Sequence, residues 1–242
     1  MKRTLCFDFG NTRMKAALFE DNTLKETFVL ENGEVSTVEK LVQSYHPQKT
    51  ILASVIDHSP LIGDYLSSNS QFILVNHQTK YPVTTPVGKP ETIGADRWAL
   101  VVAANDLFPS KNNLVIALGT CITYNFVSQD AEFLGGSISP GLQMRFKAMN
   151  HYTAKLPLIE FDEKENFPLV AYDTRTNLLS GVIWGMAKEI DGVIEAYQGK
   201  YGNFNAVLTG GNSAYFARHL KNKIFADPNL IFKGLKAIAD HN

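Results

Sequence analysis

The sequence has few cysteines, no long apolar run and no excess of either charge. Its two cysteines, Cys6 and Cys121, each lie in an apolar stretch and form no CxxC pair, so we expect reduced, buried thiols. No apolar run approaches the ~20 residues of a membrane-spanning helix, which argues against a membrane protein. Because the formal net charge is −1 and no long run carries one sign, the electrostatic footprint of a nucleic-acid-binding protein is absent.

Histidines are also few, and they show no spacing typical of metal ligands or of a catalytic triad. They are His46, His58, His77, His151, His219 and His241. The segment Met1-Lys2-Arg3-Thr4 leads directly into an apolar run, with acidic Asp8 soon after, so we expect no signal peptide. We therefore expect a soluble, cytoplasmic protein without nucleic-acid or membrane partners.

The chain does have enough apolar sequence for a substantial core. Of its 242 residues, 45% are hydrophobic, which suits one large domain or two small ones. Strand-like and helix-like segments alternate in two rounds, so we expect an α/β fold. The natural division falls in the polar segment 110–113, which gives an N-terminal domain over 1–112 and a C-terminal domain over 113–242.

Hydrophobic periodicity predicts the elements of both rounds. Strands are expected over residues 4–9, 14–20, 24–30, 50–55, 71–75, 114–118, 121–127, 131–138 and 204–208. Helices are expected over 35–45 and 59–67, from 93 or 94 to 108, and over 174–198, with Pro140 starting another. Prolines make residues 78–91 a loop.

The segment Asp8-Phe9-Gly10-Asn11-Thr12 closes the first apolar run, and a second strand-like run follows it. A hairpin of this kind can bind phosphate, because Gly10 lets the backbone approach an anion while turn amides and the Thr12 hydroxyl donate to it. Asp8 would then hold Mg²⁺ through water. The alternative is an ordinary hairpin turn, in which Asp8 and Asn11 only satisfy the backbone.

Glycine-bearing turns follow apolar strands at four places, over 8–12, 117–121, 135–141 and 209–213. Their recurrence suggests two α/β lobes whose turns bind one polyanion in the cleft between them, because glycine amides and helix N-termini favour phosphate. The alternative is that these glycines simply end strands, as they do in any α/β protein.

The segment Gly94-Ala95-Asp96-Arg97 is the second chemical candidate, at the start of an otherwise apolar helix. Asp96 would act as a general base, and Arg97 would orient a substrate or a phosphate. The alternative is that Asp96 complements the helix dipole while Arg97 is solvated.

In their order along the whole chain, these motifs resemble those of the type III pantothenate kinases, in the superfamily of actin, sugar kinases and heat-shock-chaperone ATPases. The motifs are Asp-x-Gly-Asn-Thr, Gly-x-Asp-Arg, Gly-Thr-x-x-Thr, Gly-Gly-x-Ile-x-Pro-Gly and Thr-Gly-Gly. The resemblance implies two ribonuclease-H-like lobes with a nucleotide cleft between them, and a homodimer. It also implies phosphorylation of pantothenate to 4'-phosphopantothenate, the first step of coenzyme A synthesis, with ATP, Mg²⁺ and a monovalent cation, K⁺ or NH₄⁺.

The resemblance also implies roles for individual residues. The nucleotide-binding residues would be Asp8, Phe9, Gly10, Asn11, Thr12, Arg13, Gly119, Thr120, Gly210 and Gly211. The pantothenate-binding residues would be Gly94, Ala95, Asp96, Arg97 and Thr174. By the same resemblance, Asp96 would be the general base toward the pantothenate hydroxyl.

Four positions depart from the family pattern. The family has an aspartate that helps bind the monovalent cation where this chain has Ala117, and a second acidic residue where it has Asn125. Thr85 and Val87 stand where the family tends to have Asn and Tyr. We therefore expect an active kinase with a weakened or absent potassium site. Two alternatives remain open, a degenerate nucleotide-binding regulatory paralogue and a sugar or acyl kinase of the same superfamily.

Overall fold

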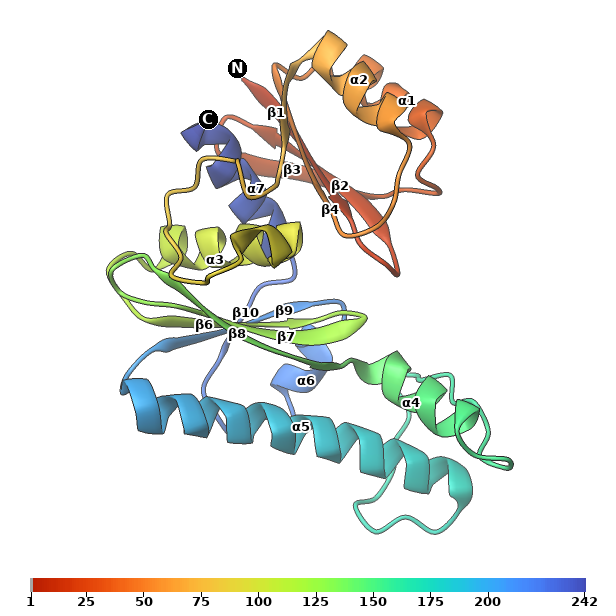
Figure 1. Cartoon of the computed structure of the whole chain (residues 1–242). Helices are drawn as coiled ribbons and strands as arrows, with labels where there is room; N and C mark the ends of the chain where they lie inside the picture. Colours follow the sequence, from red (N-terminus) through yellow and green to blue (C-terminus); the bar gives the residue numbers. More distant parts are fainter. Residues whose placement is uncertain (1) are drawn as a thin grey trace. The chain divides into compact units, whose positions relative to one another are not determined.

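A computed structural model describes residues 2–242 of the chain. They form two compact units (Figure 1). The first unit extends to Lys111 and also includes Val127–Gly135 and Asn229–Asn242; the second comprises Asn112–Phe126 and Gly136–Pro228. The observed units are therefore discontinuous in sequence, unlike the division into 1–112 and 113–242, because the C-terminal segment packs with the N-terminal unit.

The first unit is built on a five-stranded sheet with the order β3-β2-β1-β4-β5. Its strands are β1 (Arg3–Phe9), β2 (Met14–Glu20), β3 (Thr23–Val29), β4 (Lys49–Ser54) and β5 (Gln71–Leu74). β1 pairs antiparallel with β2 and parallel with β4. Since the central strands are buried on both faces, β1 is a nearly continuous apolar run that ends at the Asp8 turn.

Helices cover both faces of this sheet. On one face, α1 (Val35–Tyr45) and α2 (Pro60–Asn69) pack against apolar side chains of β1 and β4 (Figure 1). α7 (Leu230–His241) contacts β1, β2 and β4, and it packs against α3 (Ala95–Leu107). A short 3₁₀ helix, η1 (Pro90–Thr92), precedes α3 at the end of the proline-rich loop. The helix that carries Asp96 is therefore supported by the last helix of the chain.

Gly234 lies where α7 and α3 approach each other most closely. A Cβ atom at this position would overlap the carbonyl oxygen of Ala99 and lie 3.2 Å from the Cβ of Ala103. We expect Gly234→Ala to lower the free energy of unfolding by about 3 kcal/mol, because backbone atoms of α3 cannot move aside cheaply. Urea denaturation measures the change. Gly192→Ala on a helix of the second unit is the control, since it enters open space and should be neutral or slightly stabilising.

The second unit is built on a sheet with the order β8-β7-β6-β9-β10. Its strands are β6 (Asn113–Leu118), β7 (Cys121–Val127), β8 (Phe133–Pro140), β9 (Asn205–Gly210) and β10 (Phe225–Ala226). β6 and β9 are parallel, as are β9 and β10. The two sheets thus repeat one strand order, β3-β2-β1-β4-β5 and β8-β7-β6-β9-β10, so the two rounds of strands and helices seen in the sequence form two sheets of the same topology.

The helices of the second unit are α4 (Leu142–His151), α5 (Thr174–Tyr201) and α6 (Ser213–Ala217). The long helix α5 buries one apolar face against the sheet, with α4 and α6 beside it in the same core (Figure 1). Within residues 2–242, no helix is both long and apolar enough to cross a membrane.

Two expectations about elements require correction. Pro140 does not start a helix; it is the last residue of β8, and α4 begins at Leu142 after Gly141 at its N-cap. The helix α7 was not expected from the sequence, nor was the short strand β10. The strong amphipathic pattern of α7 was present in the sequence, but its partner surface on α3 is distant in the chain.

Candidate active site

Asp8 lies at the end of β1, next to the turn that joins β1 to β2. In the strand register it stands opposite Lys15 of β2 and Ala53 of β4. The Gly10 amide donates to the Arg13 carbonyl at 3.3 Å, which closes the turn, and residues 11–13 are exposed at its tip. The carboxylate is thus held on a rigid central strand, while the glycine turn presents backbone outward.

The environment of Asp8 raises its pKa from 3.8 to about 7. Burial is the main cause, the positive charge of Lys15 opposes it, and the negative charge of Asp96 adds to it. Asp8 and Asp96 therefore interact within the first unit. Lys15 was not assigned a role from the sequence; the signal that could have revealed it is its position directly across the hairpin from Asp8.

Asp96 lies in the first turn of α3, whose N-cap is Gly94. The amides of Arg97 and Trp98 donate to the Gly94 carbonyl at 3.0 and 3.3 Å. A Cβ atom on residue 94 would lie 2.5 Å from Oδ1 of Asp96, so the Asp96 carboxylate occupies the space that a side chain at position 94 would need. Burial raises the pKa of Asp96, while the amide and the charge of Arg97 lower it.

Replacing Gly94 by alanine should displace the Asp96 carboxylate. The Asp96 carboxylate can move away from the new methyl group more easily than backbone could, so we expect little change in the free energy of unfolding. Because the displaced carboxylate is no longer in position to act as the base, we expect kcat to fall roughly 10- to 100-fold. Steady-state kinetics and thermal unfolding together separate the two effects. Gly63→Ala on α2 is the control, because its Cβ would make an ordinary 3.6 Å contact with Phe72. Unchanged kcat in Gly94→Ala would show that the carboxylate position is not critical.

Arg97 and Trp98 are packed rather than solvated. The guanidinium of Arg97 lies 5.5 Å from the centroid of the Phe133 ring, and Trp98 is 3% exposed. Trp98 stacks on Tyr81 with ring centroids 4.3 Å apart and meets Phe133 edge-on. The start of α3 is therefore fixed by aromatic contacts from the proline-rich loop and from β8.

The two departures from the family pattern in this loop lie beside the same strand. Thr85 Oγ1 donates to the Phe133 carbonyl at 2.7 Å and accepts from the Val87 amide at 3.2 Å. Val87 approaches Gly135. Thr85 therefore has a structural role, because its hydroxyl ties the loop to β8.

In the second unit, the turn at Gly119 and Thr120 packs against Gly141. The Gly119 amide donates to the Cys121 carbonyl at 3.0 Å, and the Gly141 amide donates to the Thr120 carbonyl at 3.1 Å. A Cβ on residue 141 would overlap the Gly119 oxygen and lie 2.5 Å from the Thr120 oxygen. Glycine at position 141 is thus required by the close approach of two backbones.

Gly210 belongs to the same end of this sheet. It stands opposite Leu118 in the β6–β9 register, its φ is +96°, and a Cβ there would lie 2.7 Å from the Leu118 carbonyl carbon. Ser213 Oγ donates to the Gly210 carbonyl at 2.7 Å, and Gly211 is exposed with open space around it. Three of the four glycine turns therefore converge at one end of the second sheet.

Thr174, Ala117 and Asn125 also lie in the second unit. Thr174 is the exposed first residue of α5, directly after an Asp173 capping box. Ala117 stands opposite Thr209 in the β6–β9 register. Asn125 is fully buried, and its Nδ2 donates to Thr123 Oγ1 at 3.0 Å. Neither departure from the family pattern supplies a carboxylate.

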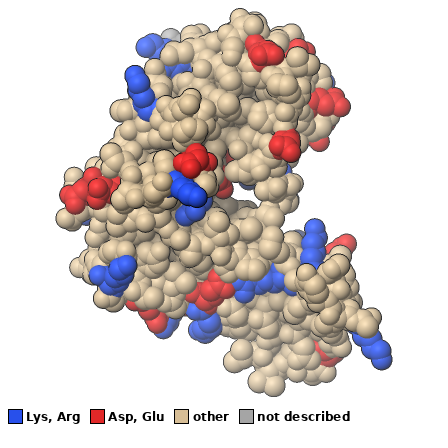
Figure 2. Space-filling view, in the orientation of Figure 1, with Lys and Arg blue, Asp and Glu red and all other residues tan. Residues whose placement is uncertain are grey.

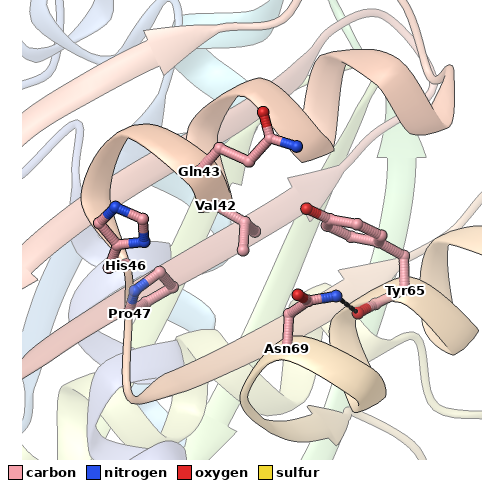
Figure 3. A pocket seen from close by; sticks show the side chains of 6 residues that line it. All are labelled: Val42, Gln43, His46, Pro47, Tyr65 and Asn69. Carbon is pink, nitrogen blue, oxygen red and sulfur yellow. Dashed lines mark hydrogen bonds between the residues drawn. The ribbon is translucent and has the colours of Figure 1, made fainter.

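Two hollows in the surface contain none of the expected site residues. One, of about 320 Å³, lies between α1 and α2 and is lined by uncharged side chains and His46 (Figure 3). The other, of about 290 Å³, is lined by residues of 163–167 and 215–219 together with Trp184. Figure 2 shows acidic and basic side chains interspersed over the visible face, without a patch of one sign.

Residues 4–196 match the sequence model of the family described as type III pantothenate kinase. A type III pantothenate kinase from Flavobacterium johnsoniae is 38% identical over 235 residues, which cover 96% of this chain and 95% of that one.

Solved structures share the fold at low sequence identity. A structure described as a Baf family transcriptional activator from Campylobacter jejuni has a TM-score of 0.62 at 22% identity and covers 98% of each chain. An inorganic polyphosphate/ATP-glucomannokinase from Arthrobacter has a TM-score of 0.52 at 15% identity, covering 100% of this chain and 98% of its own. These likenesses indicate the two-lobed α/β fold of actin-like ATPases and sugar kinases. The match over residues 4–196 and the 38% identity to the Flavobacterium johnsoniae protein assign the family: the chain belongs to the type III pantothenate kinases.

Proposed function

We propose that this enzyme transfers the γ-phosphoryl group of ATP to pantothenate, giving 4'-phosphopantothenate in the first step of coenzyme A synthesis. The observation that carries the proposal is the pair of interacting carboxylates in the first unit. Asp8 ends the central strand and Asp96 starts α3, and burial raises the pKa of both. Two half-buried carboxylates with different surroundings are suited to two different roles, one as a base and one as a cation ligand.

In this proposal, Asp96 is the general base that accepts the proton of the pantothenate hydroxyl. Burial favours its protonated form, so the carboxylate accepts a proton more readily than an exposed aspartate. Gly94 and Ala95 place it, and Arg97 holds a fixed positive charge beside the substrate. Thr174 of the second unit contributes to pantothenate binding.

Each unit by itself contains glycine turns that supply proposed nucleotide-binding residues. Residues Asp8 to Arg13 bind phosphate in the first unit, and Gly119, Thr120, Gly210 and Gly211 bind the nucleotide in the second. The close backbone packing at Gly141 and Gly210 supports this assignment, because it holds these turns in one conformation. Phosphoryl transfer depends mainly on such positioning.

The side chains of the first unit fit a Mg²⁺ ion that is bound together with ATP and not held by the protein alone. Among residues 2–242, no cluster of three or more His, Cys, Asp or Glu side chains could hold a metal alone. Mg²⁺ is usually held by one or two carboxylates, water and phosphate oxygens, and Asp8 provides a half-buried carboxylate of this kind. When bound, the ion neutralises charge on the β- and γ-phosphates.

We also propose a homodimer, supported by apolar side chains that are exposed in and beside one irregular segment of the second unit. They are Tyr152, Leu158, Leu169, Val170 and Tyr172. Exposed apolar residues gathered in this way are typical of interaction surfaces. Light scattering at several protein concentrations tests the dimer.

A coupled assay of ADP release with pantothenate tests the function. Turnover that requires pantothenate and yields the phosphorylated acid supports it. Turnover with a sugar or an acyl acid in its place would identify another kinase of this superfamily. Nucleotide binding without turnover on any acceptor would identify a regulatory protein, the alternative that Ala117 and Asn125 favour.

The monovalent-cation site gives a separate prediction. K⁺ needs several oxygen ligands, and the methyl group of Ala117 supplies none, so replacing K⁺ by Na⁺ or a large organic cation should change turnover less than about twofold. Ionic strength is held constant in this assay. Ala117→Asp should introduce a response to K⁺ and lower the KM for ATP. Many-fold activation of the wild type by K⁺ would mean that other oxygens build the site.

A further inference from the structure

An ion pair in the second unit joins four elements. Arg145 of α4 pairs with Glu189 of α5. Glu189 also accepts a hydrogen bond of 3.0 Å from the Tyr124 hydroxyl on β7. Arg145 also binds the end of β8: its Nε donates to the Pro140 carbonyl at 2.8 Å, and its Nη2, which also binds Glu189, donates to Ser139 Oγ at 3.1 Å.

This network is adjacent in the chain to Gly141, the residue whose backbone packs on the Gly119–Thr120 turn. The Pro140 carbonyl, which Arg145 binds, directly precedes Gly141, whose amide donates to the Thr120 carbonyl. The Arg145 amide in turn donates to the Gly141 carbonyl at 3.0 Å. Arg145 thus binds the carbonyl groups on both sides of the Gly141 α-carbon, and the Gly141 backbone packs closely against Gly119 and Thr120.

The pair is partly buried. The side chains of Arg145 and Glu189 are 22% and 27% exposed, so both charges have lost much of their hydration. Burial opposes the charged form of Glu189, but the hydrogen bonds from Arg145, Ser139 and Tyr124 and the charge of Arg145 outweigh it and hold the pKa of this carboxyl below its ordinary value. The pair does have a fixed geometry, since three hydrogen bonds orient the guanidinium and two orient the carboxylate.

We propose that Arg145 and Glu189 are positioning residues for the nucleotide: they touch no substrate, and they hold Gly141 so that the Gly119–Thr120 turn keeps the conformation that binds phosphate. The proposal rests on the nucleotide role proposed above for this turn. Loss of the pair releases the β8–α4 turn, and the phosphate-binding backbone then samples several positions. A displacement of about 1 Å at such a site costs up to roughly 100-fold in rate.

The test compares Glu189→Gln with Glu195→Gln. Both lie on α5 and both remove an ion pair, but Glu195 pairs with Lys221 at the surface. For Glu189→Gln we expect the KM for ATP to rise about tenfold while the KM for pantothenate changes less than twofold. Glu195→Gln should change neither. Equal changes in the two KM values, or none, would overturn the proposal, since a purely structural pair does not discriminate between substrates.

Milder variants keep the proposal testable if a charge deletion prevents folding. Tyr124→Phe removes only the hydroxyl that donates to Glu189, and a two- to threefold rise in the KM for ATP is expected. Arg145→Lys keeps the charge but loses the forked geometry, so it should weaken ATP binding more than Tyr124→Phe does. Unchanged ATP affinity in both folded variants would contradict the positioning role.

Direct binding of a fluorescent ATP analogue separates this inference from the proposed function. If the wild type binds the analogue but does not phosphorylate pantothenate, the proposed function fails, and the variants still test the positioning role. In that case, weaker analogue binding by Glu189→Gln than by Glu195→Gln supports it, and equal binding refutes it. A wild type that binds no nucleotide refutes both.

Discussion

Asp96→Asn is expected to lower kcat by roughly 10²–10⁴ while leaving ATP binding nearly unchanged, because asparagine keeps the size of the side chain but cannot accept the proton. The pKa of Asp96, which desolvation raises, supports this expectation, since a desolvated carboxylate binds a proton more tightly than an exposed one. Steady-state kinetics with pantothenate and a binding assay with an ATP analogue measure the two quantities.

Asp106→Asn serves as the matched control for this variant. Asp106 lies on the same helix, α3, but is exposed near its other end, so the substitution should leave kcat within twofold of the wild type. If Asp96→Asn changed only the KM for pantothenate and not kcat, Asp96 would bind substrate rather than act as the base.

Asp8→Asn is expected to abolish Mg²⁺-dependent turnover and, at the same time, to make the protein more stable at pH 8 without Mg²⁺. The first effect follows because an amide is a poor ligand for the ion that Asp8 is proposed to hold. The second follows because the wild type must bury a charge at this pH, whereas asparagine is neutral. A residue kept at a cost in stability is typical of a functional site.

The pH dependence of the free energy of unfolding determines whether Asp8→Asn is more or less stable than the wild type at a given pH. The pKa of Asp8 is about 7 in the folded protein against 3.8 as the ordinary value, so between these pH values the folded state keeps a proton that the unfolded state has lost. The free energy of unfolding contributed by Asp8 therefore falls as pH rises from 4 to about 7 and is constant above that. The advantage of Asp8→Asn over the wild type should grow across the same window.

Thermal unfolding of both proteins at several pH values, without Mg²⁺, measures this difference. Asp64→Asn is the control, because Asp64 is exposed on α2 and its replacement should alter stability little at any pH. Near-wild-type turnover of Asp8→Asn at saturating Mg²⁺ would show that Asp8 is only a turn residue. Lower stability of the variant at pH 8 would show that the buried charge is well compensated.

The hairpin at Asp8 and the helix that starts after Gly94 follow from local sequence. The strands β1 and β2 are specified by two apolar runs, and the turn between them by a glycine. Both signals act over a few neighbouring residues, so they can be recognised in the sequence alone. In the same way, the apolar spacing over 35–45 specifies α1, which has these bounds in the structure. The order of the motifs also identified the family, since it reflects the chain as a whole.

The environment of the site, by contrast, depends on segments that are distant in the sequence. The raised pKa of Asp8 requires burial and the nearby charge of Asp96, and the close packing at Gly210 arises only because β9 pairs with β6. The support of α3 by α7 likewise depends on contact at Gly234, more than one hundred residues along the chain. Periodicity and turn residues determine which elements form, whereas burial, charge proximity and backbone approach exist only once those elements have packed.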